Sequence, residues 1–87
     1  MANIKSAMKR AEITRIRTRR NAAYKSMMKT AIRRFETALK DGDMAKAREE
    51  LTKAISTIDK IQSKGVIHKN TASRKKSRLT KALNKAS

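Results

Sequence analysis

Several features that often carry a protein's function are missing from this 87-residue sequence. It has no cysteine, which excludes a disulfide framework and a zinc site built from thiolates. It has no proline and only two glycines, so few positions would interrupt a helix. One tyrosine and one phenylalanine are the only aromatic residues, too few for base stacking to be the main mode of binding. These absences favour an all-α chain without a metal or a cofactor.

Acidic residues are also scarce. The chain has 7 aspartates and glutamates against 24 lysines and arginines, which gives a formal net charge of +17. Repulsion on this scale opposes a compact state unless anions are bound, so a polyanionic partner is expected. The start, "MANIKSAMKR", lacks the apolar core of a signal peptide, and no apolar run is long enough to cross a bilayer. We therefore expect a cytoplasmic protein that binds no membrane.

The two glycines predict where helices end. Gly42 and Gly65 can each take the left-handed conformation that closes a helix, and Asp43 can cap the helix that follows. The predicted helices are 6–40, 44–64 and 69–86, and the short connections make neighbouring helices antiparallel.

Apolar residues recur at helical spacing in all three predicted helices and indicate one shared core. The residues of this predicted core are Tyr24, Met28, Ala31, Phe35, Ala38 and Leu39 in the first helix, with Met27 and Ile32 beside them; Met44, Ala47, Leu51, Ala54, Ile55, Ile58 and Ile61 in the second; and Ala72, Leu79, Ala82, Leu83 and Ala86 in the third. The fold class that follows is an all-α three-helix bundle.

The first helix is too long for this bundle. At about 1.5 Å per residue it spans roughly 50 Å against about 30 Å for the second helix, so residues 1–21 are expected to overhang a bundle formed by residues 22–87. Arg15, Arg17, Arg19 and Arg20 stand within this overhang, and its charges surround the helix. A helix that is polar all round needs support from outside the fold. We expect the overhang to be frayed when free and ordered by phosphates.

Charge is unevenly distributed among the predicted helices. Residues 1–40 carry a net +10, residues 41–64 carry zero and residues 65–87 carry +7. The middle helix is therefore expected to face solvent or a weakly charged neighbour, while the outer two form the binding side. On the third helix, Arg74, Arg78, Lys81 and Lys85 predict one basic stripe opposite the apolar residues.

Nothing in the sequence indicates an enzyme. The single histidine, His68, has no cysteine or carboxylate pair nearby, and is expected to start a helix or to contact a phosphate. The carboxylates have structural explanations, such as pairing of Glu49 with Lys53. A basic zipper would need more heptads than the chain has before "DGD" interrupts them. Two hypotheses remain, which are binding to structured RNA, favoured by the all-round basic helix, and histone-like binding or compaction of DNA.

Three stretches, "MANIKSAMKR", "RRNAAYKSMMKTAIRRFETAL" and "GVIHKNTASRKKSRLTKALN", resemble in order and spacing the family of the twentieth protein of the bacterial small ribosomal subunit. The resemblance covers nearly the whole chain. It implies a structural constituent that binds directly to small-subunit ribosomal RNA through phosphates and ribose and helps the RNA to fold and assemble. It also implies a monomer within the ribosome, in at most peripheral contact with other small-subunit proteins and without a small-molecule substrate.

The resemblance also implies which residues face the RNA. They are Lys5, Lys9, Arg10, Arg15, Arg17, Arg19, Arg20, Asn21, Lys25 and Lys29 in the first helix, and His68, Lys69, Asn70, Arg74, Lys75, Arg78 and Lys81 at and within the third. Met8 departs from the family pattern, which leads us to expect another basic residue at that position.

Overall fold

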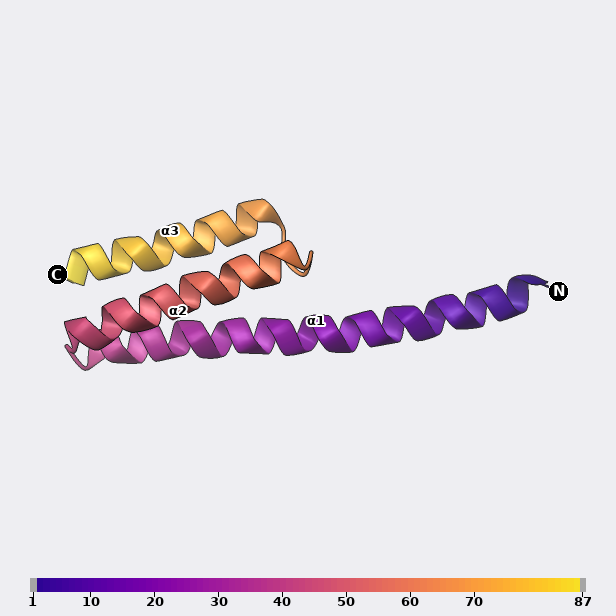
Figure 1. Cartoon of the computed structure of the whole chain (residues 1–87), viewed down its shortest axis with the longest axis horizontal. Helices are drawn as coiled ribbons and strands as arrows, with labels where there is room; N and C mark the ends of the chain where they lie inside the picture. Colours follow the sequence, from indigo (N-terminus) through magenta and orange to yellow (C-terminus); the bar gives the residue numbers. More distant parts are fainter. Residues whose placement is uncertain (1, 87) are drawn as a thin grey trace.

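The computed structural model describes residues 2–86, and the side chains of residues 5–86. Within that range the chain forms three α-helices, which are α1 (Ala2–Lys40), α2 (Met44–Ser63) and α3 (Lys69–Ala86) (Figure 1). The all-α fold with an elongated first helix is thereby confirmed. The first helix begins at Ala2 rather than at residue 6, because no residue in this segment is a helix breaker.

Both glycines close a helix as the sequence predicts. Gly42 has φ of 78° and Gly65 has φ of 76°, a region that side chains with a Cβ rarely enter. After α2, the Gly65 amide donates to the Gln62 carbonyl at 2.9 Å, and the Val66 amide donates to the Ile61 carbonyl at 3.3 Å. The same two bonds recur around Gly42, so both helices end in a Schellman motif.

Asp43 caps the start of α2. Its carboxylate accepts a hydrogen bond from the Lys46 amide at 3.1 Å and so satisfies one of the unpaired donors of the first turn. Replacing Asp43 with alanine is expected to lower the free energy of unfolding by about 1 kcal/mol, since that amide would lose its acceptor. Urea denaturation followed by circular dichroism measures the change. An Asp41→Ala variant in the same turn is the control, and an equal effect of both changes would contradict a capping role for Asp43.

The core occupies the half of the molecule where all three helices are present. Its buried residues are Met28, Phe35, Ala38, Ala47, Leu51, Ala54, Ile58, Ile61, Ala72, Leu79 and Leu83. Half-buried residues pack around them: Tyr24, Ala31, Ile32, Leu39, Met44, Ile55, Val66 and Ile67. The periodicity of α1 and α2 therefore identified most of the core positions, but Met27, predicted beside the apolar residues of α1, is 47% exposed.

The prediction fails at two alanines of α3. Ala82 and Ala86 are exposed rather than buried, because α3 packs against one helix and needs only the narrow stripe of Ala72, Leu79 and Leu83. Val66 and Ile67, in the turn before α3, were not predicted to pack on the core but do so. Val66 and Ile67 of this turn thus cover part of the core, which Ala82 and Ala86 do not reach.

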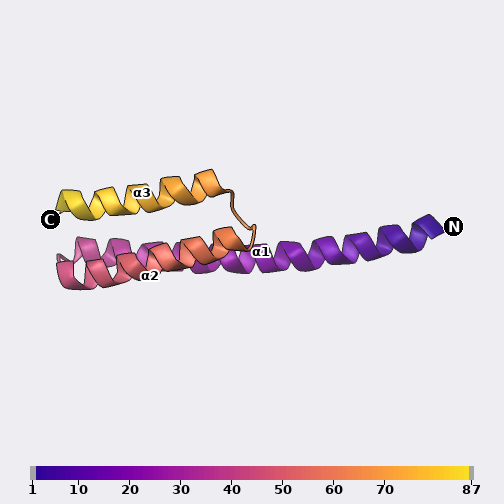
Figure 2. The same cartoon turned by 45° about the horizontal axis from the view of Figure 1, so that its top comes forward.

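The neutral middle helix takes the central position. α2 packs along both α1 and α3, whereas α1 and α3 touch each other little. Figure 1 shows α2 between its two neighbours, and Figure 2 shows α3 set apart from the α1–α2 pair. Lys76 of α3 pairs with Asp59 of α2 at 2.6 Å and adds a polar tie between them. The expectation that the middle helix would face solvent or a weakly charged neighbour therefore holds only for its exposed surface, since its packed faces lie against the two strongly basic helices.

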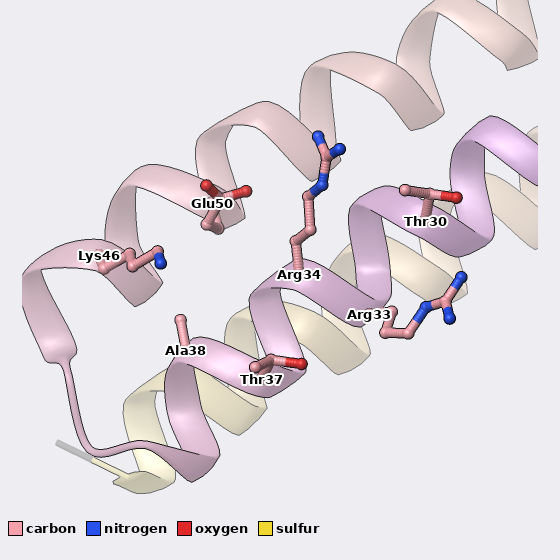
Figure 3. A pocket seen from close by; sticks show the side chains of 7 residues that line it. All are labelled: Thr30, Arg33, Arg34, Thr37, Ala38, Lys46 and Glu50. Atoms are coloured by element: carbon pink, nitrogen blue, oxygen red, sulfur yellow. The ribbon is translucent and has the colours of Figure 1, made fainter.

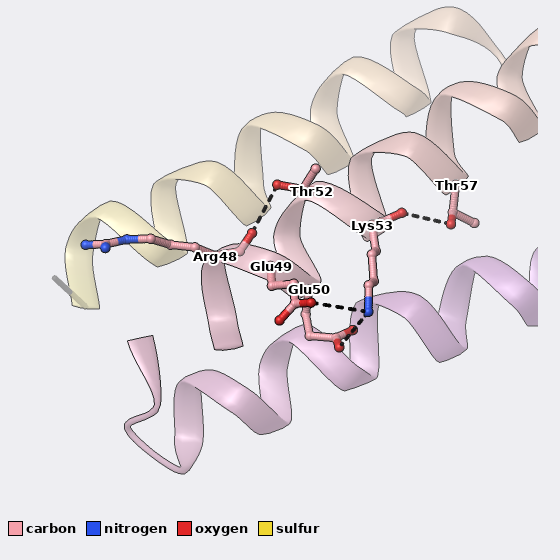
Figure 4. Close-up of polar contacts among 6 residues, drawn as sticks. All are labelled: Arg48, Glu49, Glu50, Thr52, Lys53 and Thr57. Carbon is pink, nitrogen blue, oxygen red and sulfur yellow. Dashed lines mark hydrogen bonds and ion pairs between the residues drawn. The ribbon is translucent and has the colours of Figure 1, made fainter. Parts of the chain in front are cut away.

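Some of the charges and hydroxyls on the exposed surface of α2 are paired within the helix. Lys53 lies 3.7 Å from Glu50 and 3.9 Å from Glu49, one helical turn away (Figure 4). The pairing of Glu49 with Lys53 is thus confirmed. The hydroxyls of Thr52 and Thr57 donate to backbone carbonyls four residues earlier, as Figure 4 also shows.

None of the helices within residues 2–86 combines the length with the apolar character that crossing a bilayer requires.

Candidate nucleic-acid interface

The overhang of α1 is a free-standing basic helix. The side chains of residues 5–20 are all exposed, and Figure 1 shows this half of α1 extending beyond α2 and α3. Seven of the predicted RNA-facing residues lie here: Lys5, Lys9, Arg10, Arg15, Arg17, Arg19 and Arg20. At 100° per residue these cations point in many directions around the axis. This geometry suits an environment in which anions approach from several sides.

Two other side chains of the overhang refine this description. The Thr18 hydroxyl donates to the Thr14 carbonyl at 2.8 Å, so its hydrogen is used within the helix and is not free for a phosphate. Met8, where a basic residue was expected, is 68% exposed and contributes no charge. Neither observation removes a cation from the overhang.

A groove between α1 and the start of α3 brings together residues that are far apart in the sequence. Lys25 and Lys29 of α1 line it on one side, and His68 and Lys75 line it on the other. Met28, Val66, Ile67 and Thr71 complete the lining. We call this surface the α1–α3 groove. Three lysines and no carboxylate line it, so it suits the backbone of a polyanion.

His68 has a structural role that fixes its orientation in this groove. Its Nδ1 accepts a hydrogen bond from the Asn70 amide at 3.1 Å, and its carbonyl accepts from Ala72 at 3.0 Å, so His68 caps α3. This confirms the expectation that His68 starts a helix. Because Nδ1 is an acceptor, the hydrogen of the neutral imidazole is on Nε2. The exposed ring can therefore donate from Nε2 to an anion while it caps the helix.

The outward face of α3 forms a second basic surface. Arg74, Arg78 and Lys81 line a shallow hollow with Ser73 and Ser77. All five side chains are exposed, and Lys69, Asn70 and Lys85 are exposed as well. Arg74, Arg78, Lys81 and Lys85 are spaced by about one helical turn, which places them in a row on the face of α3 opposite its buried residues. The predicted stripe is therefore present, and we call it the α3 face.

The protein's own carboxylates do not neutralise these surfaces. Between residues 5 and 86 the ion pairs are those of Lys53 with Glu49 and Glu50, and of Lys76 with Asp59. No arginine in that range has a carboxylate within salt-bridge distance. The described residues also contain no cluster of histidine and acidic side chains able to hold a metal ion. The charge of the chain is thus available to an external anion.

Comparison with known proteins decides the family. A family model described as ribosomal protein S20 matches residues 2–84 of the chain. The chain belongs to the ribosomal protein S20 family. Its relatives include a protein named small ribosomal subunit protein bS20 from Pelotomaculum thermopropionicum, 62% identical over 98% of this chain and 97% of the relative. Proteins of the same name from Natranaerobius thermophilus and Heliobacterium modesticaldum are 61% and 56% identical, and each alignment covers at least 96% of both chains.

Membership of the S20 family accords with the resemblance that the sequence motifs indicate. The matched residues include the overhang as well as the packed helices, so both parts are features of the family match. Because the S20 family is one of ribosomal proteins, the protein is not an enzyme.

The sequence-predicted residues fall into three places on this fold. Those of the overhang stay apart from the rest, those of the α1–α3 groove converge, and Arg74, Arg78 and Lys81 lie on the α3 face. Asn21 is half-buried where the overhang meets the packed helices. Thr71 and Ile67 also line the groove, although neither is among the residues that the sequence predicted to face RNA. Their place depends on how α3 approaches α1, which no local pattern encodes.

Proposed function

We propose that this protein is a structural component of the small ribosomal subunit that binds directly to small-subunit ribosomal RNA and helps it to fold and assemble. Its family and its relatives, which are named as small-subunit proteins, support this role. In this proposal the protein acts in the cytoplasm, as a monomer on the ribosome, with at most peripheral contacts to other ribosomal proteins.

The observation that carries the proposal is the excess of unpaired cations on three surfaces with different shapes. Phosphate contacts fix position and supply most of the affinity for nucleic acid. The overhang has cations around its whole circumference and few apolar residues, which suits insertion between RNA segments that surround it. The α1–α3 groove and the α3 face have cations beside hydroxyl groups, which suits phosphates and 2′-hydroxyls.

The residues proposed to contact RNA are those that the sequence indicated: Lys5, Lys9, Arg10, Arg15, Arg17, Arg19, Arg20, Asn21, Lys25, Lys29, His68, Lys69, Asn70, Arg74, Lys75, Arg78 and Lys81. Guanidinium groups can donate two parallel hydrogen bonds to one phosphate, whereas lysines act as point charges. The DNA-binding alternative rests on net charge alone, and nothing in the fold favours it over RNA.

Capture of the tagged protein from a cell lysate, with and without ribonuclease, tests the proposal. We expect small-subunit ribosomal RNA to co-purify at moderate salt and to be lost after ribonuclease treatment. An equal amount of ribonuclease-resistant DNA retained on the protein would overturn the assignment to RNA. Direct binding to protein-free small-subunit RNA, measured over a range of salt concentrations, should give a log-log slope of about 6 to 10 for a phosphate footprint of this width.

A further inference from the structure

A second groove runs between α1 and α2. It consists of two adjoining hollows that share Thr30, Arg34 and Glu50. One continues towards the turn after α1, and its other lining residues are Arg33, Thr37, Ala38 and Lys46. The other continues towards the overhang, with Ser26, Met27, Ala31, Lys53 and Thr57. We call the whole surface the α1–α2 groove.

This groove carries three cations without an acidic partner. Arg33, Arg34 and Lys46 are exposed, and none has a carboxylate within salt-bridge distance in the described part of the chain. The one carboxylate in the groove, Glu50, is only 13% exposed in its side chain and is paired with Lys53 at 3.7 Å. Figure 3 shows Arg34 standing beside α2 and Arg33 directed away from α2. The two guanidinium groups can therefore reach different parts of one bound backbone.

Hydroxyl groups lie on either side of the two arginines along α1 (Figure 3). Within residues 5–86 the hydroxyls of Thr30 and Thr37 have no hydrogen-bond partner. Figure 3 shows both on α1, in the same stretch as the two arginines. Residues 26–37 of α1 cover about 16 Å at about 1.5 Å per residue, a length that suits several consecutive phosphates of one strand.

Arg34 in the α1–α2 groove faces away from the α1–α3 groove, whereas Arg33, four residues after Lys29, lies only about 40° from Lys29 around α1. Arg34 follows Lys25 by nine residues, which at 100° per residue places it about half a turn around α1. A single RNA segment bound in the α1–α3 groove would therefore leave the cations Arg34 and Lys46 of the α1–α2 groove without an anion.

From these observations we infer that the α1–α2 groove binds the phosphate backbone of an additional RNA segment, distinct from the one in the α1–α3 groove. The inference rests on the proposed function and extends it, because the protein then holds two parts of the RNA together across α1. Arg33 and Arg34 would donate to phosphate oxygens, Lys46 would supply a point charge, and Thr30 and Thr37 would donate to phosphate or ribose oxygens.

The test compares variants of the full chain on protein-free small-subunit ribosomal RNA. The groove variant combines Arg33→Gln, Arg34→Gln and Lys46→Gln. The control variant combines Lys40→Gln, Arg48→Gln and Lys60→Gln, which removes the same charge from exposed positions outside the groove. We expect the groove variant to lower the log-log salt slope of binding by about 2 to 3, since each phosphate contact contributes about 0.9. The control should lower it by much less.

Chemical footprinting locates the lost contacts. The groove variant should lose protection of one RNA segment, and a variant of the α1–α3 groove with Lys25→Gln, Lys29→Gln and Lys75→Gln should lose protection of another. A groove variant that behaves like its control overturns the inference, and so does loss of the same nucleotides in both variants. If the variant of the α1–α3 groove also bound the RNA unchanged, the proposed function itself would fail.

Folding and charge are checked separately. Glutamine is a good helix former, so helicity measured by circular dichroism should not change in the groove variant. An Arg33→Lys, Arg34→Lys variant keeps the charge and should recover most of the salt slope. Failure of the lysines to recover it, with the fold intact, would contradict an electrostatic contact with a phosphate backbone.

Discussion

Replacing Phe35 with alanine is expected to lower the free energy of unfolding by about 3 to 5 kcal/mol. Phe35 has no exposed surface and is, with Ile58 and Ile61, one of the largest fully buried side chains. The change removes an aromatic ring from the contact between α1 and α2 and leaves a cavity that long helices cannot close. A domain of this size has a stability on the order of 5 kcal/mol, so the variant should retain little stability without RNA.

Thermal and urea denaturation followed by circular dichroism measure this effect. Met27→Ala is the matched control, because Met27 lies on the same helix and is 47% exposed. It should cost less than about 1 kcal/mol, as surface substitutions usually do. Equal losses for the two variants would show that α1 is not held by the core around Phe35.

The overhang should change its hydrogen exchange more than any other part of the chain when RNA binds. In free protein, amides of residues 5–20 are expected to exchange at nearly the rate of an unfolded chain. Their side chains are exposed, their charges repel at i,i+3 and i,i+4, and no core residue lies among them. Phosphates on several sides would remove the repulsion and stabilise the helical conformation that the structure describes.

Exchange measured by mass spectrometry with and without ribosomal RNA tests this expectation. RNA should slow exchange in residues 5–20 by at least about tenfold, which corresponds to about 1.4 kcal/mol of added helix stability. Amides around Ile58 in α2 serve as the internal control and should be protected in both states. Strong and equal protection of residues 5–20 in free and bound protein would contradict the view that RNA orders the overhang.

Local signals in the sequence predicted the helices well. Gly42, Gly65 and Asp43 act through their own backbone and side chain, so the turns that they form need no distant residue. The apolar period of α2 also identified its buried face, because that helix is covered by neighbours on two sides. In α3 the apolar period wrongly predicted that Ala82 and Ala86 are buried, because only one neighbouring helix covers α3.

The candidate site was predicted in part. Basic residues of the overhang could be assigned to a free surface from helix length and charge alone. The convergence of Lys25 and Lys29 with His68 and Lys75 could not, because it depends on where the turn after α2 places α3. For the same reason Arg33, Arg34 and Lys46 did not stand out, since they share a groove only when α2 folds back along α1.

By itself, the sequence determined the helical conformation, the positions where the chain turns and the excess positive charge, since these follow from propensity, glycine and composition. The tertiary structure alone decided that the neutral α2 lies between the two basic helices and that their cations gather into separate grooves. The physical reason is that a helix pattern states which face is apolar, but not which neighbour covers it or which distant charges that packing brings together.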